Sequence, residues 1–279
     1  MKTSALLLTF NEERNLPRCL ASLDWCDDIL VMDSGSTDAT VSIAEKAGAR
    51  VITRPFDDFA GQRNHGLDHG KFKHEYVLHL DADEEVTEEF REALLTLEPE
   101  EGINGWRVPS KTMLFGKWLK HAGMYPAYQV RLGHRDRMRF VQVGHGQRED
   151  LPGEQVGLFD VPYLHYNFSH GMRVWLSKHL NYAADEAELL LEQRNQAVPE
   201  TTASSGDSAT DARRRAKAKA ARIPLFLRPV ARFFYVYFWR QGFRDGRAGL
   251  AYAMMLSVYE GMTAILAFEK MRADKGEAE

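Results

Sequence analysis

Cysteine is scarce in this sequence, with Cys19 and Cys26 the two cysteines among its 279 residues. Two cysteines cannot form the disulfide framework that stabilises small secreted domains, and no second pair of metal-ligating type lies near them. We therefore expect both side chains to be reduced thiols in a cytosolic protein.

The sequence also lacks an excess of positive charge. Lys and Arg number 36 against 40 Asp and Glu, which gives a formal net charge of −4 and argues against a protein that coats nucleic acid. The apolar run at residues 5–8 is too short for the core of a signal peptide. A hydrophobic content of 44% is typical of a globular protein with a sizeable core.

Short apolar runs alternate with helical segments in the first part of the chain. Strands are expected at residues 4–10, 28–32, 49–53 and 76–80, with helices near residues 39–47 and 61–69. Strands separated by helices of this length predict a parallel sheet with helices on both faces. After Pro99, short strand-like pieces among glycines predict a mixed sheet, and residues 171–195 are expected to be helical.

Composition divides the chain into three parts. Residues 1–200 are expected to form the α/β domain, and residues 223–279 a helical tail. Between them, residues 201–222 are predicted to be a flexible linker, which is rich in Ser, Thr and Ala and then carries six basic residues in its last ten positions.

Polar residues follow two of the predicted strands, at the sheet edge where α/β proteins bind ligands. Asp33 begins an Asp-Ser-Gly-Ser loop before a helix, where hydroxyls, free amides and a carboxylate can bind a nucleoside. The alternative is that this loop is a capped helix start, with Thr37 or Asp38 as the cap.

Asp81 and Asp83 directly follow the strand at residues 76–80. Two carboxylates separated by one residue can face the same hard cation, whose shell phosphate oxygens complete, so the pattern predicts a metal–diphosphate site. A solvated acidic helix start and an ion-paired loop are the alternatives. A calcium loop is excluded, because Val86 occupies the position where that loop requires glycine.

The order of these motifs resembles the inverting family 2 glycosyltransferases. The similarity is carried by LLLTFNEERNL, ILVMDSGSTDAT, the Gln62-Arg63-Asn64 segment and VLHLDADEEV. Two later segments, YLHYNFSHGMRVWLSKHLNYAADEA and GFRDGRAGLAYA, are similar to bacterial enzymes that add sugars to lipopolysaccharide core or related envelope glycans. The resemblance implies an α/β, GT-A (Rossmann-like, nucleotide-sugar-binding) domain with a mixed central sheet, plus a C-terminal helical appendage.

The resemblance also implies a role for particular residues. Those expected to bind the donor are Thr9, Phe10, Asn11, Glu12, Asp33, Ser34, Gln62, Asn64, Asp81, Ala82 and Asp83. Those expected to hold a divalent metal, Mg²⁺ or Mn²⁺, are Asp81 and Asp83. Independently of the resemblance, His165 is expected to join them, because imidazole can bind a metal or a diphosphate. For His165 the alternative is a packed, hydrogen-bonded histidine with no ligand.

Direct displacement at an anomeric carbon needs a base that takes the acceptor proton and a cation that stabilises the departing nucleoside diphosphate. Similar enzymes have a His-Glu pair where this sequence has His145 and Gly146. Glu149 or Asp150 is therefore the predicted base. The alternative is that both are charges on a surface loop.

Residues 249–268 contain a single charge, Glu260, and meet the length criterion for a membrane-spanning helix. Residues 223–239 mix aromatic side chains with arginines, which suits the headgroup boundary, and the basic run at 213–222 adds attraction to anionic lipid. The tail is predicted to attach the protein to an anionic membrane surface. Packing on the rest of the chain, or homodimerisation, is the alternative.

The predicted function is that of a metal-dependent, hexosyltransferase-type enzyme. It would move a sugar from a nucleotide-sugar donor, UDP-linked, to a lipid-borne saccharide at the cytoplasmic face of the inner membrane, in lipopolysaccharide or envelope glycan biosynthesis. The alternative is a catalytically silent scaffold of the same fold in envelope assembly, which the glycine at position 146 favours. These residues identify neither the donor sugar nor the acceptor.

Overall fold

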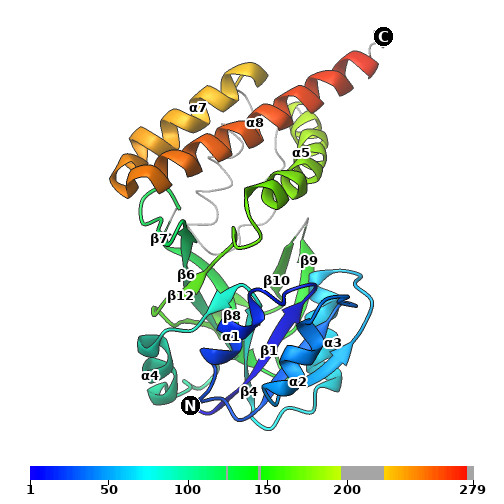
Figure 1. Ribbon diagram of the computed structural model, residues 1–279, viewed down its shortest axis with the longest axis vertical. Coiled ribbons are helices and arrows are strands. Elements are labelled where there is room, and N and C mark those ends of the chain that lie inside the picture. The colour runs from blue at the N-terminus through cyan, green and yellow to red at the C-terminus, as the bar shows by residue number, and fades with distance from the viewer. Residues whose placement is uncertain (124, 144–145, 196–222, 275–279) are drawn as a thin grey trace. The chain divides into compact units, whose positions relative to one another are not determined.

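The computed structural model describes residues 1–123, 125–143, 146–195 and 223–274 (Figure 1). The chain forms two compact units. The first comprises Met1–Met113 and Tyr125–Ser169, and the second comprises Leu114–Met124 and His170–Glu279. The predicted linker at residues 201–222 lies outside the described residues.

Strands and helices alternate at the start of the first unit, as predicted. These elements are β1 (Thr3–Thr9), α1 (Leu16–Ala21), β2 (Ile29–Asp33), α2 (Thr40–Lys46), β3 (Arg50–Thr53), α3 (Phe59–His69), β4 (Tyr76–Asp81), β5 (Glu84–Glu85) and α4 (Glu88–Thr96). Strands dominate the remainder of the unit. They are β6 (Gly105–Leu114), β8 (Ala127–His134), β9 (Phe140–Val143), β10 (Gly146–Glu149), β11 (Val156–Leu158) and β12 (Tyr163–His165).

The main sheet has the strand order β3-β2-β1-β4-β8-β6-β12-β5. β1 to β4 are parallel, β8 is antiparallel to both β4 and β6, and β12 is parallel to β6. β9 and β10 form a separate antiparallel hairpin. The predicted combination of a parallel half and a mixed half is therefore confirmed.

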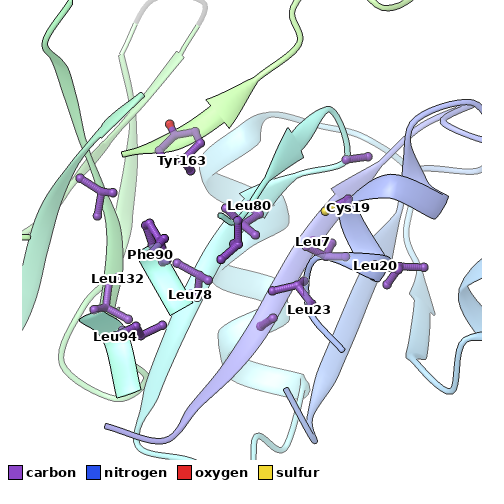
Figure 2. Close-up of a cluster of buried hydrophobic side chains, with 14 of the residues drawn as sticks. Leu7, Cys19, Leu20, Leu23, Leu78, Leu80, Phe90, Leu94, Leu132 and Tyr163 are labelled. Carbon is purple, nitrogen blue, oxygen red and sulfur yellow. The ribbon is translucent and has the colours of Figure 1, made fainter. Parts of the chain in front are cut away.

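Apolar side chains on both faces of β1 explain its central position. Leu7 packs on one face in a cluster that includes α1, α4 and the neighbouring strands (Figure 2). Leu6 packs on the other face, in a cluster that includes α3 and Phe140 of β9. Each face of the strand is buried in its own core, which fixes the strand between two layers of helices.

The strand order places three polar residues at one edge of the sheet. β2 and β4 lie on opposite sides of β1, so the direction of the strand order reverses there, which is where open α/β sheets bind ligands. In the register of the sheet, Thr9 pairs with Asp33, and Leu8 pairs with Asp81. Thr9, Asp33 and Asp81 therefore meet at the carboxyl ends of adjacent strands.

The second unit is helical. Its main elements are α5 (Met172–Asn195), α7 (Arg228–Phe234), a π-helical turn (Tyr235–Trp239), a 3₁₀ turn (Gly242–Asp245) and α8 (Gly246–Asp274), with the short strand β7 (Lys117–Trp118) in the segment at 114–124. Within this unit, α7 runs alongside α8, and α5 packs against α8 (Figure 1).

The position of α5 differs from the division made on composition, which includes this helix in the domain at residues 1–200. In the structure, Ala187 and Leu190 of α5 pack with Ala264 and Ala267 of α8. The helix therefore belongs to the same compact unit as the tail.

The segment at 114–124 is anchored inside the helical unit by Asp245. The buried carboxylate of Asp245 accepts hydrogen bonds from the backbone N–H groups of His121 (2.9 Å) and Ala122 (2.8 Å). A Cβ on Gly242 would lie 3.3 Å from the Cβ of Ala122 and 2.7 Å from the Val236 carbonyl oxygen, so this glycine permits the close approach. The GFRDG part of the sequence thus has a packing role.

We predict that Leu7→Ala lowers the free energy of unfolding by about 2–5 kcal/mol, because it removes a fully buried side chain and leaves a cavity. Leu95→Ala, at a side chain that is 44% exposed, is the control and should change it by about 0.5 kcal/mol or less. Urea unfolding followed by circular dichroism measures both. Equal effects of the two substitutions would contradict the position of β1 between two cores.

Candidate functional site

The carboxylate of Asp33 organises the loop that follows β2. It accepts hydrogen bonds from the N–H groups of Gly35 (2.9 Å) and Ser36 (2.8 Å) and from Oγ1 of Thr9 (3.0 Å). Gly35 has φ of +91°, which favours glycine at this turn. Asp33 is itself buried, so in this structure it shapes the loop. Asp38, one of the two caps considered above, accepts the N–H of Thr40 at the start of α2 (3.0 Å).

The loop after β1 is joined to the loop after β2 by hydrogen bonds. Oδ1 of Asn11 accepts the N–H of Thr37 (2.8 Å), and the N–H of Glu12 donates to Oγ1 of Thr40 (2.8 Å). Phe10 is left 58% exposed beside these contacts. The residues predicted to form the first nucleotide loop are therefore brought next to the Asp33 loop.

Gln62 and Asn64, both on α3, have different environments. Gln62 is buried, and its Nε2 donates to Oγ of Ser34 (3.3 Å) and to the Arg54 carbonyl (3.0 Å). Its Oε1 has no hydrogen-bond partner within the described part of the chain. Asn64 uses both ends of its amide on the backbone of Phe140, at 2.8 and 2.9 Å. Gln62 thus keeps a free acceptor beside Ser34, whereas Asn64 fastens β9 to α3.

Two arginines bind the two carboxylate oxygens of Asp81. Nη2 of Arg63, on α3, lies 2.7 Å from Oδ1, and Nη2 of Arg131, on β8, lies 2.8 Å from Oδ2. Both guanidinium groups are almost fully buried. Asp81 is therefore an ion-pair partner in this structure.

Glu84 is a fourth member of this buried network. Its fully buried carboxylate lies 2.5 Å from Nη2 of Arg131 and accepts the backbone N–H of Asp81 (2.8 Å). The Tyr163 hydroxyl accepts a hydrogen bond from Nε of Arg131 (3.2 Å). The turn that carries Asp81 and Asp83 is thereby held in place by side chains of β5, β8 and β12.

The network shifts the pKa of each of its members. Burial disfavours the charged form of Asp81, but Arg131 and Arg63 outweigh this and hold its pKa well below its usual range. Burial raises the pKa of Glu84 to about 7, against the opposing effect of Arg131. Burial lowers the pKa of Arg63 to about 10. For Arg131, the attraction of Asp81 and Glu84 overcomes burial and raises the pKa.

Asp83 faces His165 on the other side of the turn. Oδ2 of Asp83 lies 3.5 Å from Nε2 of His165, and about a fifth of each side chain is exposed. Burial alone would lower the pKa of His165, but the neighbouring Asp83 carboxylate raises it above its usual value. Ala82, between the two aspartates, is buried in the core.

The residues present fit a divalent cation in part. Among the described residues, no group of three or more His, Cys, Asp and Glu side chains is arranged to hold a metal. Both oxygens of Asp81 are engaged by guanidinium groups, so Asp81 does not act as a ligand in this arrangement. Asp83 and His165 supply one oxygen and one nitrogen donor, and phosphate oxygens of a donor would complete the shell that Mg²⁺ or Mn²⁺ requires.

Glu149 and Asp150, the predicted bases, lie at the end of the β9–β10 hairpin. Glu149 pairs with Phe140 in the hairpin, and the N–H of Asp150 donates to the Arg139 carbonyl (2.7 Å). Glu149 is half-buried and Asp150 is exposed. His145, which precedes Gly146, lies outside the described residues.

Arg63, Arg131 and Glu84 are not among the site residues expected from the sequence. For Arg131 a signal was available, because an arginine between Val130 and Leu132 in an apolar strand needs a buried partner. The partner itself cannot be identified from local sequence, since Asp81 is fifty positions away.

Residues 4–146 match the protein family described as glycosyl transferase family 2. The match covers more than half of the chain, and the chain therefore belongs to this family. Its α/β fold, with a mixed central sheet followed by C-terminal helices, is the GT-A architecture that the resemblance implies.

Two curated relatives match shorter parts of the chain. The lipopolysaccharide core biosynthesis glycosyltransferase LpsC of Rhizobium meliloti (strain 1021) is 32% identical over 143 residues, which cover 49% of this chain and 52% of LpsC. The uncharacterized glycosyltransferase RC0292 of Rickettsia conorii (strain ATCC VR-613 / Malish 7) is 37% identical over 94 residues, or 33% of each chain. The matched part therefore spans about half or less of the length of these relatives.

Solved structures show a more distant likeness. S. aureus TarS is 14% identical with a TM-score of 0.44, and the match covers 95% of this chain and 55% of that chain. Glucosyl-3-phosphoglycerate synthase from Mycobacterium tuberculosis, in complex with Mn²⁺, UDP-glucose and phosphoglyceric acid, is 19% identical with a TM-score of 0.40 over 60% of this chain and 72% of that chain. Similarities of this size do not bear on activity or ligands.

We predict that Arg131→Met lowers the free energy of unfolding by about 3–5 kcal/mol, because it leaves the Glu84 carboxylate buried without its partner. Arg91→Met, which breaks an exposed pair with Glu88, is the control and should change it by about 1 kcal/mol or less. Adding Glu84→Gln to Arg131→Met should restore part of the loss. Chemical denaturation measures all three, and a double variant no more stable than Arg131→Met would argue against a buried Glu84 carboxyl group without its partner as the cause.

Proposed function

We propose that this protein is an inverting glycosyltransferase that moves a sugar from a nucleotide-sugar donor to a lipid-borne saccharide. The observation that carries the proposal is the meeting of a hydroxyl- and amide-rich loop with an acidic turn at the carboxyl edge of β1, β2 and β4, in a member of a glycosyltransferase family. That edge is where a sheet of this order binds nucleotides.

The donor is proposed to bind with its nucleoside over the Asp33 loop, where Ser34 and the free Oε1 of Gln62 offer polar partners. Thr9, Asn11 and Glu12 border the same loop, and Phe10 offers an exposed aromatic ring. A UDP-linked sugar is the proposed donor, as in the resemblance described above.

The diphosphate is proposed to lie beside Asp83 and His165. A bound Mg²⁺ or Mn²⁺ would there stabilise the charge that develops on the departing nucleoside diphosphate. Arg63 and Arg131 hold Asp81 and so fix the backbone of the turn on which Asp83 stands. Glu149 or Asp150 is proposed to take the proton from the acceptor hydroxyl.

The proposed pathway is lipopolysaccharide core or envelope glycan synthesis, which the name of the relative LpsC supports. The acceptor would be carried by lipid at the cytoplasmic face of the inner membrane. Among the described residues, one helical stretch, Gly242–Ala273, is long and apolar enough to cross a membrane by length and composition, which agrees with such a location.

The first experiment is to incubate the full chain with UDP-, GDP-, ADP- and dTDP-hexoses, Mn²⁺ and bacterial membrane extract. Release of nucleoside diphosphate that depends on the extract is the expected result, and omission of the extract is the control. No extract-dependent release from any donor would favour the alternative of a catalytically silent scaffold protein.

We predict that Asp83→Asn lowers kcat by about 10²- to 10³-fold, because a charge that stabilises the leaving diphosphate is lost. It should also weaken Mn²⁺ binding in a direct titration. Asp136→Asn, at a carboxylate that is 69% exposed, is the matched control and should change neither quantity. Wild-type rate and Mn²⁺ affinity in the Asp83 variant would remove the metal assignment.

For the base, we predict that either Glu149→Gln or Asp150→Asn lowers kcat by about 10²- to 10⁴-fold while donor affinity stays unchanged, because only proton transfer is lost. Single-turnover rates and a separate donor-binding titration distinguish the two effects. Near-normal rates in both variants would show that the base lies elsewhere.

A further inference from the structure

One side of α8 carries a continuous stripe of exposed apolar side chains. Its members recur at intervals of three, four and seven residues and are 38–61% exposed: Leu250, Met254, Val258, Ile265 and Phe268. The opposite side of the helix is buried, with Ala253, Ala264 and Ala267 almost inaccessible. No Asp, Glu, Lys or Arg shares the exposed side between Leu250 and Phe268, so the helix has an apolar outer face that the described part of the chain leaves uncovered.

A second apolar stripe lies on α7 and the turn after it. Val230, Phe234 and Phe238 recur every four residues and are each more than half exposed, and Trp239 is 81% exposed. The two helices lie together, since Oγ of Ser257 donates to the Pro229 carbonyl (2.8 Å). At one end the stripes meet, where the rings of Phe226 and Phe268 lie 5.4 Å apart.

Acidic and basic side chains of residues 223–268 differ in exposure. The two acidic residues of this segment are both bound by groups of the same unit. Asp245 is buried against the segment at 114–124, and Glu260 is bound by Arg228 at 2.9 Å (Nε) and 2.7 Å (Nη2). Arg244 and Arg247, by contrast, are exposed. The outer surface of residues 223–268 is therefore apolar and cationic, and an exposed acidic residue, Glu269, follows directly after it.

We propose that α7 and α8 form an in-plane membrane anchor, with both apolar stripes inserted at the headgroup boundary of a bilayer rich in anionic lipid. Exposed aromatic rings beside arginines suit that boundary, and anionic headgroups complement the exposed arginines. The proposal deepens the membrane location proposed above. It does not rest on the catalytic assignments, because its test measures no activity.

The packing of α5 argues against a helix that crosses the bilayer. α5 lies along α8, where Nζ of Lys270 is 2.5 Å from Glu188 and the Tyr259 hydroxyl donates to the Tyr182 carbonyl (3.4 Å). The other sides of α5 carry exposed charges, among them Lys178 and Asp185. A spanning α8 would take these charges into hydrocarbon, whereas an in-plane α8 leaves them in water.

The test is flotation of the full chain with vesicles of phosphatidylcholine alone or with 30% phosphatidylglycerol. Wild type should bind the anionic vesicles, and the double variant Met254→Glu/Val258→Glu should bind them at least tenfold more weakly. The matched control is Leu189→Glu, at a side chain 42% exposed on α5 between exposed Asp185 and Glu192, which should bind like wild type. Circular dichroism confirms that each variant is folded.

Equal loss of binding in Leu189→Glu and in the double variant would overturn the proposal, because added charge alone would then explain it. So would a wild-type protein that binds neither vesicle but forms a dimer in sedimentation that the double variant abolishes, since the stripe would then be a protein interface.

A depth measurement separates an in-plane helix from a spanning one. Fluorophores are placed on Leu250→Cys, Val258→Cys and Phe268→Cys, and quenched by lipids with nitroxides at known depths. An in-plane helix should give the same shallow depth at all three positions. A central position markedly deeper than both ends would show that α8 spans the bilayer and would overturn the in-plane arrangement.

Discussion

The buried Arg131 guanidinium between Asp81 and Glu84 is the interaction on which the site depends. It comes from β8, the strand that joins the parallel half of the sheet in the antiparallel sense, and it binds residues at the end of β4 and in β5. A guanidinium in such a place is stable only with its carboxylate partners, and the carboxylates only with the guanidinium. The acidic turn therefore has a single fixed position relative to the sheet edge, and every ligand contact proposed for it follows from that position.

Because the turn is fixed, the two aspartates of the Asp-x-Asp motif have different environments. Asp81 is turned toward Arg63 and Arg131, Ala82 packs into the core, and Asp83 is left facing His165. A carboxylate that already receives two guanidinium groups has little capacity left for a cation, whereas Asp83 has no such partner within its turn. A short Asp-x-Asp motif thus yields one structural carboxylate and one available carboxylate.

The features that could be predicted from the sequence are those with local causes. Apolar runs bounded by turn residues predicted β1 to β4, and the aspartates at their ends predicted that polar side chains would gather at one edge of the sheet. What could not be predicted depends on distant partners. In the sequence, Arg131 is one charge in an apolar strand, and its partner is identified only by the pairing of β8 with β4. Composition places α5 in the α/β domain, whereas in the structure its side chains pack on α8. Glu260 is a single charge in an apolar segment of the sequence, and its partner Arg228 lies 32 positions away.

Each of the two units contains an arginine–glutamate ion pair with little exposure to solvent, and the two pairs have different effects. In the first, Arg131 and Glu84 are buried together, which specifies where the acidic turn at Asp81–Asp83 stands. In the second, Arg228 neutralises Glu260, the single charged residue of the apolar segment at 249–268. Neither pair is expected to add much stability over a well-packed apolar replacement. Each pair instead fixes where charge lies. The first holds the turn of Asp81 in place, and the second leaves Glu260 neutralised within a helical unit that is proposed to approach anionic lipid. An apolar substitution at both members of the second pair would therefore preserve the anchor, whereas removing Arg228 alone would restore the repulsion between Glu260 and the headgroups.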